Sequence, residues 1–411
     1  MMSIKTFDPM AVKDCLVKTV NRFPLTVAFT AAFAIFAMAM VWHPDLLSRS
    51  TKADVLCYLA EGALLSAAMK FWEERTGEKH VWQQVAAHAA LVAIAVIWQQ
   101  LGFLGLGLAM AHCSVIISLV VACVFLPFMG EQTDIPAFEY GIRLFRCGFL
   151  APFAGFIPTL ALSVLVFFSF PLFFGIKASS KDFWSIAIFF QIVFPVLLFL
   201  SRVVNSKQVT GENIKVGDSW ARLANYFLIP VAATYMVILY CYECHIALAW
   251  ELPNGGVSYL VAVMMGLFFI VEGYLYFSNH ADGQDVTAWY LRQLPLLVMP
   301  LLVLMSIGIW RRVSDYGLTA ARLYLITLNI WFYIACFFML RTKVRRIHWI
   351  PVSFCIVFVL TSVLPVNYHT IARDYIVNDL NKNKATMPVN EWESRVGYLR
   401  DYYQLEYTHH E

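Results

Sequence analysis

The chain has 411 residues, of which 60% are hydrophobic, 16% aromatic and 14% charged. A soluble globular domain carries about 25% charged residues, so this chain has too few to coat a water-facing surface. Its formal net charge of +3 is too small to indicate a nucleic-acid partner, and the basic residues stand in short clusters between apolar runs, as membrane topology demands. The composition therefore excludes a soluble globular protein. It predicts an all-α, polytopic transmembrane helix bundle whose partners are membrane lipids.

Residues 1–23 carry charged side chains throughout and lead directly into a full-length apolar window. A cleavable secretory signal has a short apolar stretch instead. We therefore expect a cytoplasmic N-terminal segment, followed by a first span that is retained as a signal anchor. The nine cysteines are scattered, and most lie inside apolar runs, which argues against a disulfide framework.

A spanning helix needs about 20 mainly apolar residues to cross about 30 Å of hydrocarbon. Few residues separate the windows 81–99 and 103–128, so a different division of this pair would give ten or twelve spans. Counted separately, eleven windows meet the requirement: 24–42, 54–71, 81–99, 103–128, 150–175, 182–201, 222–244, 257–277, 293–310, 319–340 and 347–364.

The Lys and Arg residues of the connecting segments predict the orientation. Most of them face the inside if the N-terminus is inside, which agrees with the positive-inside rule. With eleven spans the C-terminus is then outside. The polar, turn-rich segment 203–221 divides the membrane part into an N-terminal half (24–202, about six spans) and a C-terminal half (222–364, about five spans). No internal repeat supports an inverted-repeat transporter architecture.

Two segments outside the windows have helical patterning. We expect residues 132–148 to form either an amphipathic helix in the plane of the membrane interface or the polar start of the fifth spanning helix. Residues 365–411 form a polar tail that packs on the outer loops or binds a protein partner. Its apolar residues recur at helical spacing at Ile371, Tyr375 and Leu380 and again at Trp392, Val396, Leu399 and Tyr403.

Ionisable side chains inside the hydrocarbon region are costly, so they are the first candidates for function. Glu61 and Glu272 lie within apolar windows, and Tyr274 follows Glu272 in a tyrosine-rich helix. Each carboxylate could relay a proton or cation or pair with a buried Arg; alternatively, each is kept neutral by hydrogen bonds. His88 and His112 also lie in apolar helices, and they either line the same path or serve as hydrogen-bonded packing residues.

The run from Cys241 to His245 has the Cys-x-x-Cys-His pattern of covalent haem attachment. The run continues a spanning helix instead of standing in a flexible loop, and no axial Met motif accompanies it. The simpler interpretation is two helix-lining cysteines with a His at the interface. We therefore predict no cofactor and no metal site.

A charged hairpin joins the windows that end at residue 310 and begin at residue 319. Arg311 and Arg312 stand four and three residues before Asp315 and can pair with it on one helical face. Gly317 supplies a helix stop, and Thr319 can cap the next helix. Arg311, Arg312 and Arg322 lie on the predicted outer side, against the positive-inside rule. We therefore also consider Arg311, Arg312, Asp315, Tyr316 and Arg322 as contacts for an anionic lipid or substrate group.

The sequence of the hairpin also resembles that of a known family. Residues 312–322, Arg-Val-Ser-Asp-Tyr-Gly-Leu-Thr-Ala-Ala-Arg, are similar to the signature of a bacterial inner-membrane family, domain of unknown function four-one-five-three. The segment from Ile229 through spaced tyrosines to Pro253-Asn-Gly and the run Leu364-Pro-Val-Asn are similar as well, whereas Cys241 and Cys244 stand where apolar residues are usual. The resemblance covers about residues 20–380. It implies a polytopic bacterial inner-membrane protein with no established activity. In that membrane, the orientation predicted from the Lys and Arg residues places the N-terminus in the cytoplasm and the C-terminus in the periplasm.

Three functional hypotheses follow. The first is transport or permeation of a small solute or ion along a polar path that includes Glu61 and Glu272. The second is a membrane-embedded enzyme or assembly factor that acts on a lipid-linked or anionic substrate at the outer face. The third is a sensor or scaffold that holds a partner through the C-terminal tail. The sequence carries no recognisable catalytic motif, so it leaves open whether the protein is an enzyme.

Overall fold

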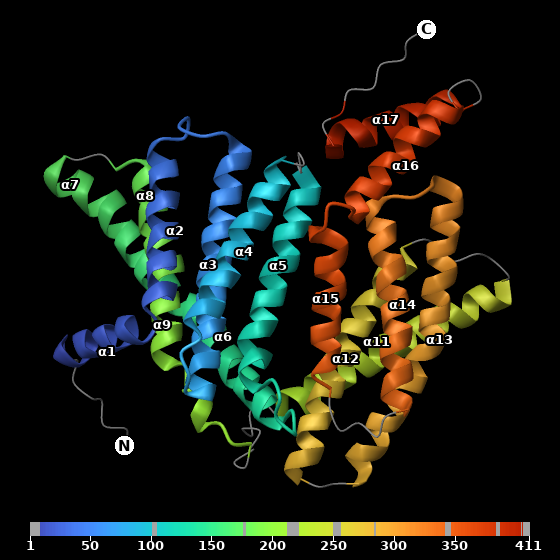
Figure 1. Ribbon diagram of the computed structural model, residues 1–411, viewed down its shortest axis with the longest axis horizontal. Coiled ribbons are helices and arrows are strands. Elements are labelled where there is room, and N and C mark those ends of the chain that lie inside the picture. The colour runs from blue at the N-terminus through green and yellow to red at the C-terminus, as the bar shows by residue number, and fades with distance from the viewer. Residues whose placement is uncertain are drawn as a thin grey trace. The chain divides into compact units, whose positions relative to one another are not determined.

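The computed structural model describes residues 9–100, 105–175, 178–211, 222–249, 256–282, 285–341, 347–383, 387–403 and 405. Over these residues the secondary structure is helical and contains no strand, which confirms the predicted all-α fold (Figure 1). The chain forms two compact units. The N-terminal unit comprises Met1–Phe103, His112–Glu131 and Pro136–Thr210, and the C-terminal unit comprises Leu104–Ala111, Gln132–Ile135 and Gly211–Glu411.

Ten of the described helical stretches are long and apolar enough to cross a membrane. They lie in α2 (Pro24–Trp42), α3 (Arg49–Thr76), α4 (Val81–Gln100), α5 (Gly105–Phe125), α6 (Ile135–Val164) continued by α7 (Phe170–Phe174), α8 (Ser180–Ile188) continued by α9 (Phe194–Arg202), α11 (Ile229–Ala249), α12 (Val257–Asp282), α13 (Asp285–Tyr316) and α14 (Ala320–Arg341). The predicted windows 81–99 and 103–128 are therefore two separate spanning helices.

Taken together, α15 (Trp349–Val363) and α16 (Tyr368–Asn383), which are bent by 44° relative to each other, are long and apolar enough to count as an eleventh span. Alone, α15 is only about 22 Å long. It runs antiparallel to α14, because Trp331 Nε1 donates to Ser353 Oγ at 3.1 Å and, nearer the start of α14, Tyr324 OH lies 2.8 Å from Ser362 Oγ. The chain thus returns along the whole of α14, as the predicted window 347–364 requires.

The amphipathic segment at 132–148 is the start of a spanning helix. From Ile135 to Val164 α6 is continuous, so residues 135–148 do not form a separate helix in the interface plane. Arg143 pairs with Glu139 one turn earlier on the same helix, and this neutralises its charge where the helix enters the apolar region.

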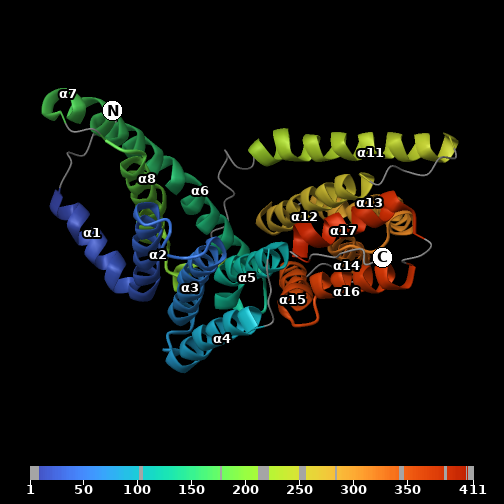
Figure 2. The same ribbon diagram turned by 90° about the horizontal axis from the view of Figure 1, so that it is seen from above.

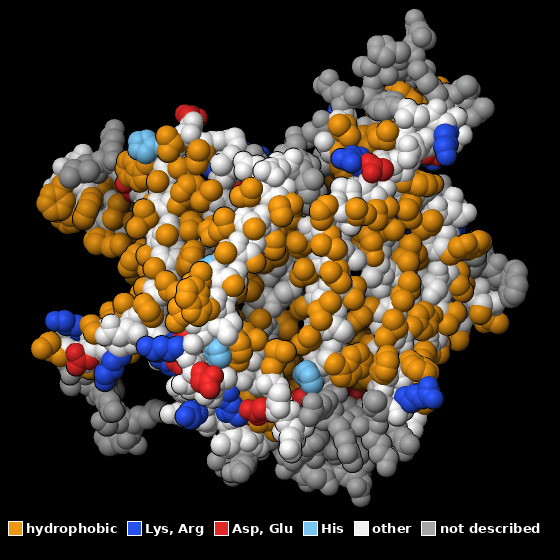
Figure 3. Space-filling model, viewed as in Figure 1, with side chains coloured by type: hydrophobic (Ala, Val, Ile, Leu, Met, Phe, Trp, Pro, Cys, Tyr) orange, Lys and Arg blue, Asp and Glu red, His pale blue; other side chains and the backbone are white. Residues whose placement is uncertain are grey.

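In each unit, apolar side chains cover the middle of the helices and charged side chains gather near the helix ends (Figure 3). This distribution matches a hydrocarbon core with polar boundaries on both sides. Large aromatic side chains such as Phe153, Phe168 and Phe173 are exposed on the helix surfaces, where lipid tails would surround them. The chain is therefore an integral membrane protein.

Helix α3 forms the core of the N-terminal unit. Its small residues Ala67 and Ala68 are buried together with Phe71, and this cluster also takes in Phe23 and Tyr140. Three T-shaped or tilted ring pairs connect the aromatic members of the cluster. The close approach that small residues permit is typical of helix packing in membranes.

Two arginines fix the last turns of α3 to neighbouring segments. Arg22, the last residue of α1 (Pro9–Arg22), donates two hydrogen bonds to Glu74, at 2.6 and 2.8 Å, and a third to the carbonyl of Val203. Arg75 pairs with Glu131 and donates to the carbonyls of Ser206 and Val209. These contacts lie at the end of the span, where a charge costs less than at its centre.

The C-terminal tail forms two helices that pack on each other, α16 and α17 (Val389–Tyr403). They lie across the ends of α14 and α15 (Figure 2). The predicted stripe at 392, 396, 399 and 403 is confirmed, since these residues pack in the cluster around Leu399. On α16 the predicted stripe is right at Leu380 and wrong at Ile371 and Tyr375, which are exposed. The buried face contains His369, Ala372, Ile376 and Leu380.

Substitution Arg75→Ala should destabilise the N-terminal unit by about 2–3 kcal/mol, because it leaves Glu131 and two carbonyls without their cationic donor. Thermal unfolding of the purified protein in detergent measures this. Arg146→Ala removes an exposed arginine and serves as the matched control, with an expected change within about 0.5 kcal/mol. Equal effects of the two substitutions would contradict the assigned role of Arg75.

Candidate functional site

The structure brings two of the predicted site residues together. Glu61 lies near the middle of α3, and its Oε1 atom is 2.8 Å from Nδ1 of His112 on α5. The residues are 2% and 5% exposed, so the pair is closed off from the surface of the N-terminal unit. The partner of this buried carboxylate is thus an imidazole and not an arginine.

The surroundings of the pair are apolar on one side and ionisable on the other. The ring of Trp98 meets His112 edge-on at 5.1 Å between centroids, and His112 Nε2 has no hydrogen-bond partner among the described residues. Asp54 lies about two helical turns before Glu61 on the same face of α3, close enough to His112 for their charges to interact. Sequence reasoning missed Asp54, although its spacing from Glu61 was the signal that could have found it.

His88, on α4, approaches α3 about one turn after Glu61. Its Nδ1 atom is 2.8 Å from the carbonyl of Gln84, which can only accept, so Nδ1 carries a hydrogen. Its Nε2 atom is 3.1 Å from Ser66 Oγ, which is also 2.7 Å from the carbonyl of Gly62. A neutral His88 accepts the hydroxyl hydrogen of Ser66, whereas a protonated His88 donates to Ser66 and leaves that hydrogen to Gly62.

Packing holds His88 in this position. The ring of Phe29 stacks on the imidazole at 5.4 Å and 20°. A Cβ atom at position 62 would overlap the same Phe29 ring, so glycine is required there for α2 and α3 to approach. Asp54 and the Glu61–His112 pair thus share one face of α3, whereas Ser66, about 140° further around the helix, meets His88 on another face.

Glu272 is buried in the C-terminal unit at 1% exposure. Both of its carboxylate oxygens are buried and have no hydrogen-bond partner among the described residues. The thiol of Cys336 on α14 lies within electrostatic range of this carboxyl group. Tyr274, the other predicted residue on α12, points elsewhere, because its hydroxyl donates to Asn225 Oδ1 at 3.1 Å. Tyr274 and Glu272 therefore do not act on one point.

The hairpin residues separate into different roles. The Arg312 guanidinium lies over the ring of Tyr259 on α12 at 5.7 Å, a cation–π contact. Arg322 donates to the carbonyl of Gly317, and Arg311 lies in α13. The side chains of Asp315 and Tyr316 lie outside the described part of the chain, and so does the predicted pairing of Asp315 with the arginines.

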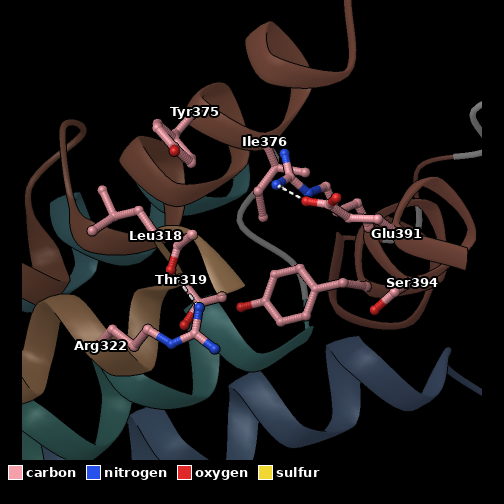
Figure 4. A pocket seen from close by; sticks show the side chains of 10 residues that line it. Leu318, Thr319, Arg322, Tyr375, Ile376, Glu391 and Ser394 are labelled. Carbon is pink, nitrogen blue, oxygen red and sulfur yellow. Dashed lines mark hydrogen bonds and ion pairs between the residues drawn. The ribbon is translucent and has the colours of Figure 1, made fainter. Parts of the chain in front are cut away.

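Arg322 also lines a cavity of about 580 Å³, formed by the hairpin, α16 and α17 (Figure 4). Sequence reasoning could not find the α16 and α17 side of this cavity, because its residues lie more than fifty positions away from Arg322. The lining residues are Gly317, Leu318, Thr319, Arg322, Tyr375, Ile376, Glu391, Ser394, Arg395 and Tyr398.

The predicted site residues of the C-terminal unit do not form one site. Within the C-terminal unit, Glu272 and the Tyr259 ring under Arg312 are about 20 Å apart along α12 at a rise of about 1.5 Å per residue. Glu61, His88 and His112 belong to the N-terminal unit. The N-terminal unit thus contains the Glu61–His112 pair, and the C-terminal unit contains two separate polar sites, the Glu272 carboxyl group and the hairpin cavity.

Helix α11 runs unbroken through the Cys-x-x-Cys-His motif to Ala249, and Cys241 and Cys244 are exposed free thiols. The motif is thus part of a helix and not a flexible loop. Within the described ranges, no three His, Cys, Asp or Glu side chains come close enough to hold a metal ion.

Comparison with known proteins gives one informative similarity. The chain is similar to Uncharacterized protein PM1469 of Pasteurella multocida (strain Pm70), with 28% identity over 165 residues. The matched part covers 39% of this chain and 28% of that protein, so the chain spans less than a third of its relative's length. No protein-family model matches the chain, and no solved structure matches it.

Substitutions at Glu61 and His112 should be strongly non-additive. Glu61→Leu and His112→Leu each leave one buried polar partner unsatisfied and should cost about 1–3 kcal/mol. The double substitution removes both partners, so it should cost less than the sum of the singles by about 1 kcal/mol. Equilibrium unfolding in mixed detergent micelles measures the cycle. Additive costs would show that the 2.8 Å contact contributes nothing to stability.

Proposed function

We propose that this integral membrane protein moves a small solute or ion across the membrane and couples that movement to protons, with the Glu61–His112 pair as the protonation site. The observation that carries the proposal is the position of the pair, buried at 2% and 5% exposure near the middle of a spanning helix. Ionisable groups at such a depth are costly, and they mark ion pathways and proton relays.

Proton counting explains why this pair suits coupling. With one proton shared between carboxylate and imidazole, the pair is neutral overall, either as a neutral acid and base or as an ion pair. Loss of that proton leaves a net negative charge, and a second proton leaves a net positive charge. Either charge is unfavourable inside hydrocarbon, so release of the proton favours entry of a cation in its place. This is the stoichiometry of one-for-one exchange.

Other polar groups lie along α3 on either side of the Glu61–His112 pair. Asp54 lies towards the start of α3, and Ser66 with His88 lies towards its end. The Ser66 hydroxyl changes its acceptor between Gly62 and His88 according to the protonation state of His88. Such a hydroxyl transfers a proton without moving the backbone. Ser66 and His88 therefore form a second polar pair beside α3, separate from the Glu61–His112 pair.

Glu272 provides a second protonation site in the same proposal. A buried carboxylate without a partner would be far costlier than its neutral acid, so this group holds a proton unless a cation reaches it. The hypothesis of an enzyme or assembly factor at the outer face concerns another place, the hairpin cavity. The positive-inside rule, applied to eleven spans, supports our proposed orientation in the inner membrane, with the N-terminus cytoplasmic and the C-terminus periplasmic. The family resemblance stays a prediction.

The transport proposal is tested in liposomes that contain the full-length protein and a pH-sensitive dye. We expect an imposed Na⁺ or K⁺ gradient to change the internal pH faster than in protein-free liposomes. Glu61→Gln should lower that rate at least tenfold, because the amide cannot exchange a proton. Glu78→Gln changes an exposed glutamate and should leave the rate unchanged. A Glu61→Gln protein with the wild-type rate would refute the relay, and wild-type liposomes that match protein-free ones would refute transport.

Glu272→Gln should separate protonation from folding. The amide replaces a neutral acid of nearly the same shape, so unfolding free energy should change by less than about 1 kcal/mol, while the proton flux should fall. Unfolding and flux are measured on the same preparation. Unchanged flux would remove Glu272 from the pathway and leave the role of the Glu61–His112 pair untouched.

A further inference from the structure

The buried face of α6 consists of small residues. In the second half of this helix every fourth residue is buried and the others are partly or fully exposed; the buried ones are Ala151, Gly155, Thr159 and Ser163. Small residues let helices approach closely in membranes. A Cβ atom at position 155 would lie only 1.9 Å from the carbonyl oxygen of Phe190, in the span formed by α8 and α9. Glycine is therefore required where the two spans of the N-terminal unit cross.

The carbonyl group of Phe190 lacks its usual helical donor. One π-helical turn separates α8 from α9. The amide of Phe194, which an α-helix would direct to Phe190, donates instead to the carbonyl of Phe189. The next residue, Pro195, has no N–H to offer in its place. Single π-helical turns are frequent at functional sites, and this one directs a backbone oxygen at the glycine of α6.

Two polar side chains lie beside this crossing. Thr159 Oγ1 donates to the carbonyl of Gly155 at 2.8 Å. Gln191, the residue after Phe190 in the π-helical turn, donates from Nε2 to Thr159 Oγ1 at 3.3 Å. The Thr159 hydroxyl has a second lone pair and the Gln191 amide has its own oxygen. Both side chains therefore offer acceptor oxygens beyond the hydrogen bonds that fix them.

Ser163 supplies a further hydroxyl, which has no partner. Its side chain is 8% exposed, and its Oγ atom is buried without a hydrogen bond to any of the described residues. It lies between two contacts that α6 makes with the α8–α9 span: Thr159 with Gln191 one turn before it, and the T-shaped ring pair of Phe167 and Phe183 one turn after it. Ser163 is therefore buried against that span. Because buried hydroxyls normally have a partner, this one indicates a ligand.

The crossing lies deep in the membrane. Gly155 is near the middle of the apolar stretch Ile135–Phe174, and Phe190 is about 15 Å from Ser180, where the next stretch begins. This is half of the hydrocarbon thickness of about 30 Å. Water is scarce at such a depth, so a backbone oxygen without an N–H donor is costly unless another electropositive group meets it.

The groups at the crossing suit a monovalent cation. A backbone carbonyl, two hydroxyls and a side-chain amide are all neutral oxygen ligands. Channels and transporters bind alkali cations at this depth through carbonyl oxygens that helices leave unpaired. Divalent cations in proteins are generally bound through carboxylates, and none of the four groups is a carboxylate. The chemistry therefore favours Na⁺ or K⁺ over Ca²⁺ or Mg²⁺.

We propose that the crossing of α6 with the α8–α9 span is a binding site for a sodium or potassium ion. The carbonyl oxygen of Phe190 and the hydroxyls of Thr159 and Ser163 are its ligands, and the Gln191 amide oxygen completes the set. This inference rests on the proposed transport function and deepens it, because it names an alkali cation as the ion that is exchanged for protons. It also gives that ion a site apart from the Glu61–His112 pair.

The test is equilibrium binding of radioactive sodium, and of radioactive rubidium as a substitute for potassium, to the purified full-length protein in detergent. Every sample carries Glu61→Gln and Glu272→Gln, so neither carboxylate contributes to the binding. This reference protein should bind at least one of the two cations saturably. An excess of the same unlabelled cation should displace the label, whereas choline should not. Binding in one arm alone identifies the ion, and binding in both shows a site for either.

Ser163→Ala is the most discriminating variant. It removes a hydroxyl without a partner among the described residues, so thermal unfolding should show no loss of stability, while the affinity for the cation should fall about fivefold. Thr159→Val removes the other hydroxyl and should weaken binding by about tenfold. Thr361→Val is the matched control and should bind like the reference protein. Thr361 also donates to the carbonyl four residues before it, that of Val357, but it belongs to the C-terminal unit.

Two results would overturn the proposal. One is that the reference protein binds neither cation saturably, and the other is that Ser163→Ala and Thr159→Val both keep the affinity of the reference protein. Neither result bears on the proton relay, because its carboxylates are substituted in every sample and no flux is measured. Conversely, a Glu61→Gln protein with the wild-type flux would refute the relay and leave cation binding at the crossing intact.

Discussion

A polar side chain inside hydrocarbon needs a partner, and this constraint determines where the charged residues of the chain lie. Water cannot solvate a charge at mid-span, so the choice is between pairing and protonation. The N-terminal unit has paired ionisable residues both at the end and near the middle of a spanning helix. Arg22 and Arg75 make their ion pairs at the last turns of α3, whereas Glu61 is paired near the centre by His112. One helix thus carries a structural clamp at its end and a neutralised acid at its middle.

The same constraint gives the two units different chemistry. In the N-terminal unit the acid is hydrogen-bonded to an imidazole. In the C-terminal unit both oxygens of Glu272 lack a partner among the described residues, so no hydrogen bond from these residues offsets the desolvation of a charged carboxylate there. In the transport proposal the first site therefore exchanges protons within a pair, and the second responds to a proton or cation that reaches it.

Much of the fold can be predicted from the sequence, because the length of each apolar window matches the hydrocarbon thickness that a helix must cross. The side chains that pair between helices cannot be predicted in this way. Glu61 and His112 are each visible as unusual residues in apolar helices, but nothing in either window indicates that they meet across 51 positions. The stripe on α16 is wrong at Ile371 and Tyr375 for a related reason: the buried face includes His369 and Ala372, which give a weak hydrophobic signal. The cavity at the hairpin is lined by three segments that lie far apart in the sequence, so no single segment could predict it.

The hairpin shows how a turn between two spans is fixed. Arg322 donates to the Gly317 carbonyl, which ties the start of α14 to the end of α13. On the predicted outer side this arginine opposes the positive-inside rule. Its contact with the turn gives it a structural role that is the same on either side of the membrane.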